Sequence, residues 1–167
     1  MKLLKIINEN SFEPQDYTIR KVVRSFILDE TETKVLFLGS MIVGGGVEDG
    51  ETDEQALARE AMEEVGATID ILKPLGEVIA YRDYLKKKYV AHGYLCKIVG
   101  TLSKATTLDP LEQKMEISWI EIPKAIEKLE NEIKSLFRDT DPIKDDITQK
   151  STHNRRTSLI FLKEIKY

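Results

Sequence analysis

The sequence predicts an α/β fold in which one mixed sheet is layered between helices. Two observations support this prediction. Runs rich in β-branched and aromatic residues lie on both sides of a segment, residues 52–66, that has the local signals of a helix. A second segment with helical periodicity follows the last of these runs. With 167 residues the chain can bury a sizeable core, and we expect a single domain over residues 1–167.

The strand-like runs form two expected antiparallel pairs and one further strand. In each pair a polar turn separates two segments of high β propensity. The predicted strands cover residues 22–28 and 34–38, residues 75–82 and 89–99, and residues 116–122.

Two helices are expected after the strands. Pro123 suits the first turn of a helix, and apolar residues then recur at helical spacing as far as Leu136. Residues 139–150 are mostly polar and predict a loop. The last helix is expected to carry Leu159, Ile160, Leu162 and Ile165.

Residues 52–66 carry the signals of a complete helix. Thr52 followed by Gln55 has the form of a capping box, and Gly66 supplies a C-terminal stop. One apolar stripe is expected to face the core. Its predicted members are Leu57, Ala58, Ala61, Met62 and Val65.

Three carboxylates lie beside that stripe. Glu60, Glu63 and Glu64 stand at positions i, i+3 and i+4, which places them on one edge of the helix. Like charges at this spacing repel each other, and a divalent cation offsets the repulsion most directly. Because Mg²⁺ prefers carboxylate oxygens and commonly acts with substrate phosphates, the spacing predicts a site for Mg²⁺ or Mn²⁺. The alternative is a solvated acidic edge.

The surroundings of these acids resemble the Nudix box. In that pattern a Gly, five residues, a Glu and seven residues precede Arg-Glu-U-x-Glu-Glu-x-Gly-U, where U is usually a bulky aliphatic. Residues 45–67 match it without insertion or deletion. The fixed positions are filled by Gly45, Glu51, Arg59, Glu60, Glu63, Glu64 and Gly66. The U positions depart from the pattern, since Ala61 and Ala67 are small. The resemblance implies an α/β/α sandwich and a metal-dependent hydrolase.

Roles follow for the residues of the box. We expect Glu51 and Arg59 to form a salt bridge that fixes the loop and orients the acidic edge. Glu60 and Glu64 are the best metal ligands by position, and Glu63 is either a third ligand or the base that activates water. The resemblance adds the carbonyl of Gly45 as a metal ligand. The predicted catalytic residues are thus Glu51, Arg59, Glu63 and Glu64.

A further acidic ligand outside the box is implied by the resemblance. Asp109, Glu112 and Glu116 precede the last predicted strand and are the candidates. Spacing alone does not separate them, and Glu116 is our choice.

Substrate contacts are expected from Arg24, Arg82 and Tyr84. The two arginines lie at strand positions that could face a phosphate cleft. Tyr84 is near the place where dinucleoside polyphosphate hydrolases of the resembled family carry a tyrosine.

Several other residues are expected to be structural. Cys96 lies in a strand-like run, and we expect its thiol to be buried. We expect His92 to be a hydrogen-bonded histidine in the sheet. Trp119 and Phe137 are expected in the core.

Composition limits partners and location. A formal charge of −4 argues against binding nucleic acid through a general basic field. No signal peptide or transmembrane span is evident, so we expect a cytoplasmic protein without a membrane partner, as a monomer or homodimer.

The predicted activity is metal-dependent hydrolysis of a pyrophosphate bond in a nucleoside diphosphate linked to another group. A nucleoside triphosphate or dinucleoside polyphosphate is expected ahead of ADP-ribose or a nucleotide sugar. A binding module without turnover would be expected to lack box acids, all of which are present. An isoprenoid diphosphate isomerase would require a catalytic cysteine near the site, and Cys96 is a poor candidate because it lies in a predicted strand.

Overall fold

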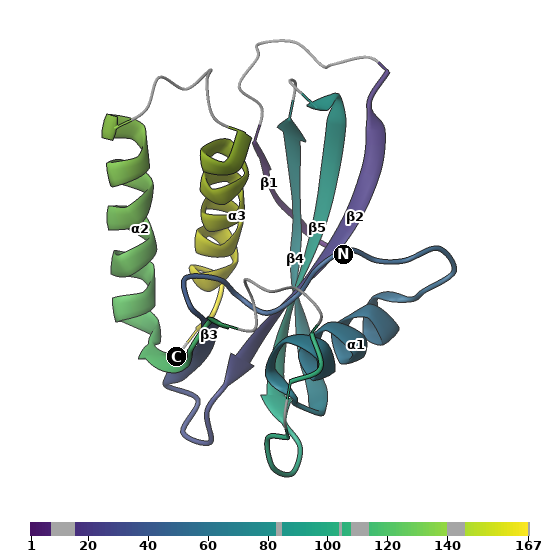
Figure 1. The fold of residues 1–167 in the computed structure, drawn as a ribbon, viewed down its shortest axis with the longest axis vertical. Helices are drawn as coiled ribbons and strands as arrows, with labels where there is room; N and C mark the ends of the chain where they lie inside the picture. Colours follow the sequence, from purple (N-terminus) through teal and green to yellow (C-terminus); the bar gives the residue numbers. More distant parts are fainter. Residues whose placement is uncertain (8–15, 83–84, 104, 108–113, 140–145, 167) are drawn as a thin grey trace.

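The computed structural model describes residues 1–7, 16–82, 85–103, 105–107, 114–139 and 146–166. Six strands and three helices lie within these ranges (Figure 1). The strands are β1 (Leu3–Ile7), β2 (Thr18–Leu28), β3 (Lys34–Leu38), β4 (Ile69–Arg82), β5 (Lys87–Ile98) and β6 (Ile117–Glu121). The helices are α1 (Asp53–Val65), α2 (Ile122–Asp139) and α3 (Asp146–Leu162).

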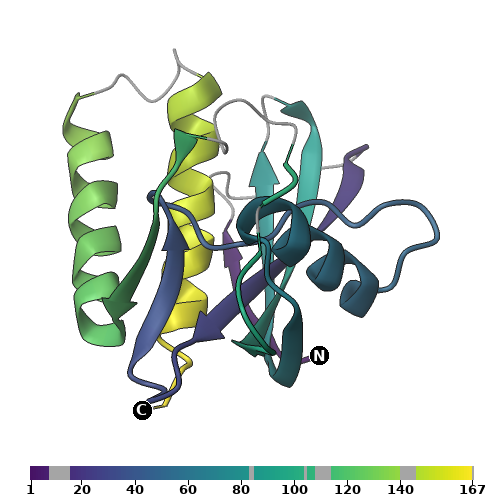
Figure 2. The same cartoon turned by 60° about the horizontal axis from the view of Figure 1, so that its bottom comes forward.

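All six strands form one mixed sheet in the order β1-β4-β5-β2-β3-β6. The β1–β4 and β2–β5 pairs are parallel, and the other three pairs are antiparallel. Both predicted antiparallel pairs are therefore confirmed. Helix α1 covers one face of the sheet, while α2 and α3 lie side by side against the other (Figure 2). The predicted α/β/α sandwich is confirmed.

Alternation along β2 divides the core between the two faces. Phe26 and Leu28 pack on the side of α2 and α3, whereas Val23 and Ile27 pack against α1. This is the period-two pattern of a strand that is buried on both faces. Each helix thus has its own apolar cluster to pack against.

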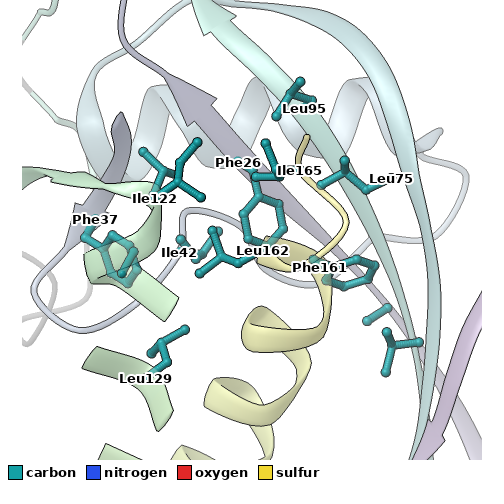
Figure 3. Close-up of a cluster of buried hydrophobic side chains, with 14 of the residues drawn as sticks. Phe26, Phe37, Ile42, Leu75, Leu95, Ile122, Leu129, Phe161, Leu162 and Ile165 are labelled. Atoms are coloured by element: carbon teal, nitrogen blue, oxygen red, sulfur yellow. The ribbon is translucent and has the colours of Figure 1, made fainter. Parts of the chain in front are cut away.

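Phe161 anchors α3 to the sheet (Figure 3). Its ring centroid lies 5.6 Å from that of Phe26. A Cβ atom at Gly93 in β5 would stand 2.5 Å from the Phe161 ring, so only glycine admits the ring at this depth. This close contact holds α3 against the strands that line the pocket described below.

Some predicted boundaries were wrong. Strand β4 begins at Ile69 and continues through Pro74, where the pairing with β5 is irregular because proline has no N–H to donate. The predicted polar loop over residues 139–150 was too long, since α2 includes Asp139 and α3 begins at Asp146. Ile165 is buried but lies beyond the end of α3.

Two of the residues expected to be structural are placed as predicted, and Trp119 is not. Cys96 is fully buried, and burial raises the pKa of its thiol to about 12. His92 contacts Asp53 through Nδ1 and Glu77 through Nε2, as expected of a hydrogen-bonded sheet histidine. Trp119 is not in the core: it is 37% exposed because β6 is the edge strand. The Phe137 side chain lies outside the described part of the structure.

Candidate active site

Helix α1 begins and ends where the local signals place it. The Thr52 hydroxyl accepts a hydrogen bond from the Gln55 amide, and the Gln55 side chain accepts one from the Thr52 amide. Gly66 closes the helix in the left-handed conformation with φ 65°. The capping box and the glycine stop are both confirmed.

The buried stripe of α1 is rotated from the predicted one. Ala58 and Met62 are exposed, while Ala56 and Glu64 are buried together with the other apolar residues. The glycine loop, residues 44–46, makes the burial of Glu64 possible, because the Gly44 amide donates to Glu64 Oε2 at 2.8 Å and satisfies the buried carboxylate.

The glycine loop runs beside β2. The Val23 amide donates to the Gly45 carbonyl at 3.0 Å, and the Val47 amide donates to the Lys21 carbonyl at 3.1 Å. Gly44 has φ 133°, and a Cβ atom there would collide with the Val23 carbonyl. A Cβ at Gly45 would collide with the Glu60 carboxylate. The loop therefore approaches both the sheet and α1 more closely than any side chain would permit.

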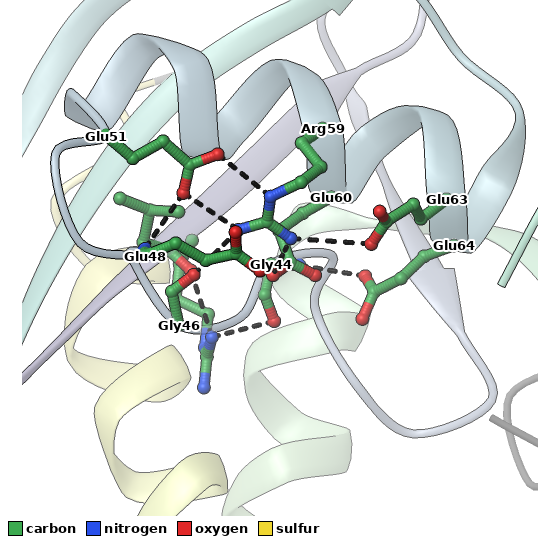
Figure 4. Close-up of polar contacts among 10 residues, drawn as sticks. Gly44, Gly46, Glu48, Glu51, Arg59, Glu60, Glu63 and Glu64 are labelled. Atoms are coloured by element: carbon green, nitrogen blue, oxygen red, sulfur yellow. Dashed lines mark hydrogen bonds and ion pairs between the residues drawn. The ribbon is translucent and has the colours of Figure 1, made fainter. Parts of the chain in front are cut away.

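Arg59 joins the glycine loop to the acidic edge (Figure 4). Its Nε and Nη2 atoms donate to the two Glu51 oxygens at 2.8 and 3.0 Å, and Nη2 also donates to the Gly46 carbonyl at 2.8 Å. Its Nη1 atom reaches Glu60 at 2.8 Å and Glu63 at 3.4 Å. The predicted Glu51–Arg59 salt bridge is confirmed, and it is bidentate.

These contacts shift the pKa values of the pair in opposite directions. The hydrogen bonds from Arg59 and from the Glu48 amide hold the pKa of Glu51 below its usual value. The hydrogen bonds to Glu51 raise the pKa of Arg59 most, and the hydrogen bond to Glu60 raises it further. The guanidinium is therefore a permanent positive charge at the centre of the acidic edge.

The three box carboxylates do not share one environment. The side chain of Glu60 is 12% exposed and Glu64 is 8% exposed, whereas the side chain of Glu63 is 45% exposed. Burial raises the pKa of Glu60, although the hydrogen bonds and charge of Arg59 oppose that rise. Glu60 and Glu64 line a pocket, and Glu63 does not.

This pocket has a volume of about 830 Å³. It lies between the glycine loop, α1, the central strands and α3. Four arginines and two glutamates line it, so its lining is positive although the whole chain is negative. The arginines are Arg20, Arg24, Arg82 and Arg155.

The structure brings both predicted substrate arginines to this pocket. Arg24 Nη1 donates to the carbonyls of Val23 and Gly44 at 2.9 and 2.8 Å. Burial lowers the pKa of Arg24, and the nearby charges of Glu64 and Glu60 act against this effect. Arg82 is 4% exposed and enters the pocket from the end of β4. Sequence reasoning did not identify Tyr89, Asn154 and Arg155, which also line the pocket.

Of the remaining predicted site residues, Glu116 is the one that the structure describes. The Glu116 side chain is exposed and absent from the pocket lining, and its carbonyl accepts a hydrogen bond from the Gly39 amide. Asp109, Glu112 and Tyr84 lie outside the described residues. Their roles, like that of Glu116, stay predictions.

The donors at the acidic edge fit a hard divalent cation. Glu60 and Glu64 supply carboxylates, and the Gly45 carbonyl keeps one lone pair beyond its bond to Val23. Within the described part of the chain, no three acidic, histidine or cysteine side chains are grouped closely enough to hold a metal alone. Mg²⁺ is commonly held by one or two carboxylates, with substrate phosphates and water completing its coordination.

In this fold a mixed sheet lies between helices, and an acidic helix edge lines the same pocket as four arginines. A family model described as "NUDIX domain" matches residues 19–140, most of the chain. The chain belongs to the Nudix family, which confirms the predicted family and the predicted class of enzyme, a pyrophosphohydrolase that acts on phosphorus anhydrides.

Solved structures agree with the fold. A MutT Nudix hydrolase from Burkholderia pseudomallei is 17% identical and has a TM-score of 0.53, with 82% of this chain and 98% of that chain covered. A MutT protein from Methanosarcina mazei Go1 is 21% identical with a TM-score of 0.51, covering 66% of this chain and 83% of that chain. A UDP-X diphosphatase is 17% identical with a TM-score of 0.50, covering 66% of this chain and 54% of that chain. Comparison with curated proteins gives no match.

Proposed function

We propose that this enzyme hydrolyses a nucleoside triphosphate or a dinucleoside polyphosphate and releases a nucleoside monophosphate. One observation carries the proposal: Glu60 and Glu64 line the same pocket as four arginines. The carboxylates suit a divalent cation, and guanidinium groups suit several phosphates at once. A pocket of about 830 Å³ also has the size of a small-molecule site.

Each group of residues has a role in the proposed reaction. Mg²⁺ bound at Glu60, Glu64 and the Gly45 carbonyl would lower the pKa of water and neutralise developing phosphate charge. Water adds to the α-phosphorus, the bond to the bridging oxygen breaks, and a carboxylate of the acidic edge accepts the proton of the water. Arg24 neutralises charge on the departing phosphates. Glu63 remains either a further ligand or the base, and Arg59 and Glu51 hold the edge in place.

We also propose where the protein is located and which class of partner it binds. Among the described residues, no helix is long and apolar enough to cross a membrane. We propose a cytoplasmic location, which the single, buried Cys96 supports because the chain forms no internal disulfide, and we propose that the protein is a monomer or homodimer. The lining of the pocket is positive within a chain of net charge −4, which supports a small nucleotide over a nucleic acid.

A substrate panel tests the proposed activity. With Mg²⁺ present, we expect the highest kcat/KM for nucleoside triphosphates or dinucleoside polyphosphates, because a chain of several phosphates can contact more than one of the arginines that line the pocket. ADP-ribose and UDP-sugars serve as the comparison arms, and released monophosphate is measured by chromatography. Efficient hydrolysis of ADP-ribose or UDP-sugars alone would overturn the ranking but not the family.

Removal of metal is expected to abolish hydrolysis. Without a cation between them, the carboxylates of Glu60 and Glu64 would repel the substrate phosphates, so turnover should disappear in excess chelator and return when Mg²⁺ or Mn²⁺ is added. Metal analysis of the chelated sample confirms that the site is empty. Full activity in that sample would contradict the metal role of the acidic edge.

A further inference from the structure

Arg82 is a buried cation whose charge is not balanced within the described part of the chain. It is 4% exposed, and its Nη2 atom donates to the Asn154 side-chain oxygen at 3.1 Å. Its Nε atom is buried and has no hydrogen-bond partner. Among the described residues, no carboxylate pairs with it. Buried charges are normally paired, because an ion that leaves water loses its hydration.

A second cation increases the imbalance. Arg24 lies within electrostatic range of Arg82, and their mutual repulsion contributes to the lowered pKa of Arg24. Arg24 also interacts with Glu64 and Glu60, so its own charge is partly compensated. Arg20 also lines the pocket but is exposed to solvent, so Arg82 is the buried lining cation that no carboxylate of the described residues compensates. A ligand that carries negative charge would balance it.

The surroundings of Arg82 hold its guanidinium in a fixed orientation. The group stacks on the Tyr89 ring, 4.1 Å from the ring centroid, and Asn154 accepts its hydrogen bond from α3. Tyr89 and Asn154 both line the pocket. Helix α3 lies beyond residues 19–140, the range that the family model matches. This end of the pocket is thus built partly by a helix outside the matched domain.

We propose that Arg82, oriented by Tyr89 and by Asn154 of α3, forms a second anion subsite that binds the phosphate of the substrate farthest from the cleaved bond. The proposal rests on the proposed function, because it assigns the terminal phosphate of a nucleotide polyphosphate. Cleavage takes place at the acidic edge, and Arg24 lies in range of both that edge and Arg82. The phosphate chain accordingly extends from Glu60 and Glu64 past Arg24 to Arg82.

A phosphate explains the arrangement better than a nucleobase does. A neutral base could accept hydrogen bonds from Arg82, but it would leave the buried charge uncompensated. A phosphate oxygen supplies both the acceptor and the negative charge, and guanidinium–phosphate hydrogen bonds are among the stronger ones in proteins. The subsite therefore selects phosphate chain length and not the identity of the base.

Asn154→Asp tests the subsite. The substitution is nearly isosteric and places a carboxylate within reach of Arg82, so the protein supplies its own anion and should not lose stability. We expect KM for nucleoside triphosphates to rise about tenfold or more, as is typical when a charged hydrogen bond is lost. KM for diphosphates should rise much less, and kcat should be nearly unchanged. Arg82→Lys should give a smaller effect of the same kind, because it keeps the charge without the planar guanidinium.

Asn131→Asp is the matched control, because it makes the same substitution at an exposed position of α2. Thermal unfolding of each variant separates a binding defect from a folding defect. Calorimetry with inorganic triphosphate and Mg²⁺ tests the subsite even in a protein that does not turn over nucleotides. Absence of turnover would overturn the proposed function alone. Equal triphosphate affinity in wild type and Asn154→Asp, or a change in base preference with an unchanged ratio of triphosphate to diphosphate KM, would overturn the subsite.

Discussion

Replacing Glu64 by glutamine is expected to reduce kcat by roughly two to four orders of magnitude, the scale of removing a principal catalytic group. The substitution removes a charge from the buried acidic edge with little change in volume. Glu64 already has one local role, since it accepts the Gly44 amide, and a glutamine side-chain oxygen can keep that bond. The loss should therefore appear in turnover and in the affinity for Mg²⁺, with the fold preserved.

Glu54→Gln provides the control for this loss. Glu54 lies on the same helix but is exposed at its first turn, so the same chemical change there should leave kcat within about twofold of wild type. Steady-state kinetics at saturating Mg²⁺, together with thermal unfolding, measures both variants. If Glu64→Gln turns over at the rate of Glu54→Gln, the carboxylate at position 64 does not act in the reaction.

Replacing Arg59 by alanine is expected to lower kcat/KM by about 100-fold, because small displacements of catalytic groups cost about that much. Arg59 contacts Glu51, Glu60 and Gly46, so its removal frees the loop from the helix and leaves the carboxylates to repel each other. Arg59 is a positioning residue, and the Mg²⁺ concentration for half-maximal activity should rise in the variant. Arg59→Lys should recover part of the activity, since it restores the charge but not the bidentate contact.

Lys124→Ala serves as the control for loss of an ion pair. Lys124 pairs with Glu121 at the protein surface, where such pairs contribute little. We expect its activity and its Mg²⁺ dependence to match those of wild type. Normal activity and unchanged Mg²⁺ dependence in Arg59→Ala would show that Arg59 is only a partner of Glu51.

The parts of the site that sequence reasoning predicted are those encoded within a short stretch of chain. Thr52, Gln55 and Gly66 define the helix by contacts within one or two turns. Glu51 and Arg59 are eight residues apart, and a helix following a short loop brings them together. Local spacing alone also grouped Glu63 with Glu60 and Glu64. The structure separates Glu63 because packing against the sheet fixes the rotation of α1, and a helical wheel does not contain that information.

The parts that were missed depend on topology. Asn154 and Arg82 are 72 residues apart, and their contact requires α3 to pack across the end of β4. No local pattern in the sequence predicts this packing. Asn154 and Arg155 stand in the polar part of α3, ahead of its apolar end, and there they are equally consistent with a solvated helix face. Strand β1 was missed for the same reason, because its partner in the described part of the sheet is β4, which lies some seventy residues later.

The position of α3 has a consequence for the order in which the enzyme becomes competent during synthesis. All the box carboxylates leave the ribosome before residue 70, and the matched domain is complete by residue 140. Asn154, Thr157 and Ser158, which close the pocket on its remaining side, emerge last. A nascent chain that stops between these points lacks α3, and with it both one wall of the pocket and the part of the core that Phe161 and Leu162 supply. The pocket and the core on that face of the sheet are therefore completed together, by the same helix.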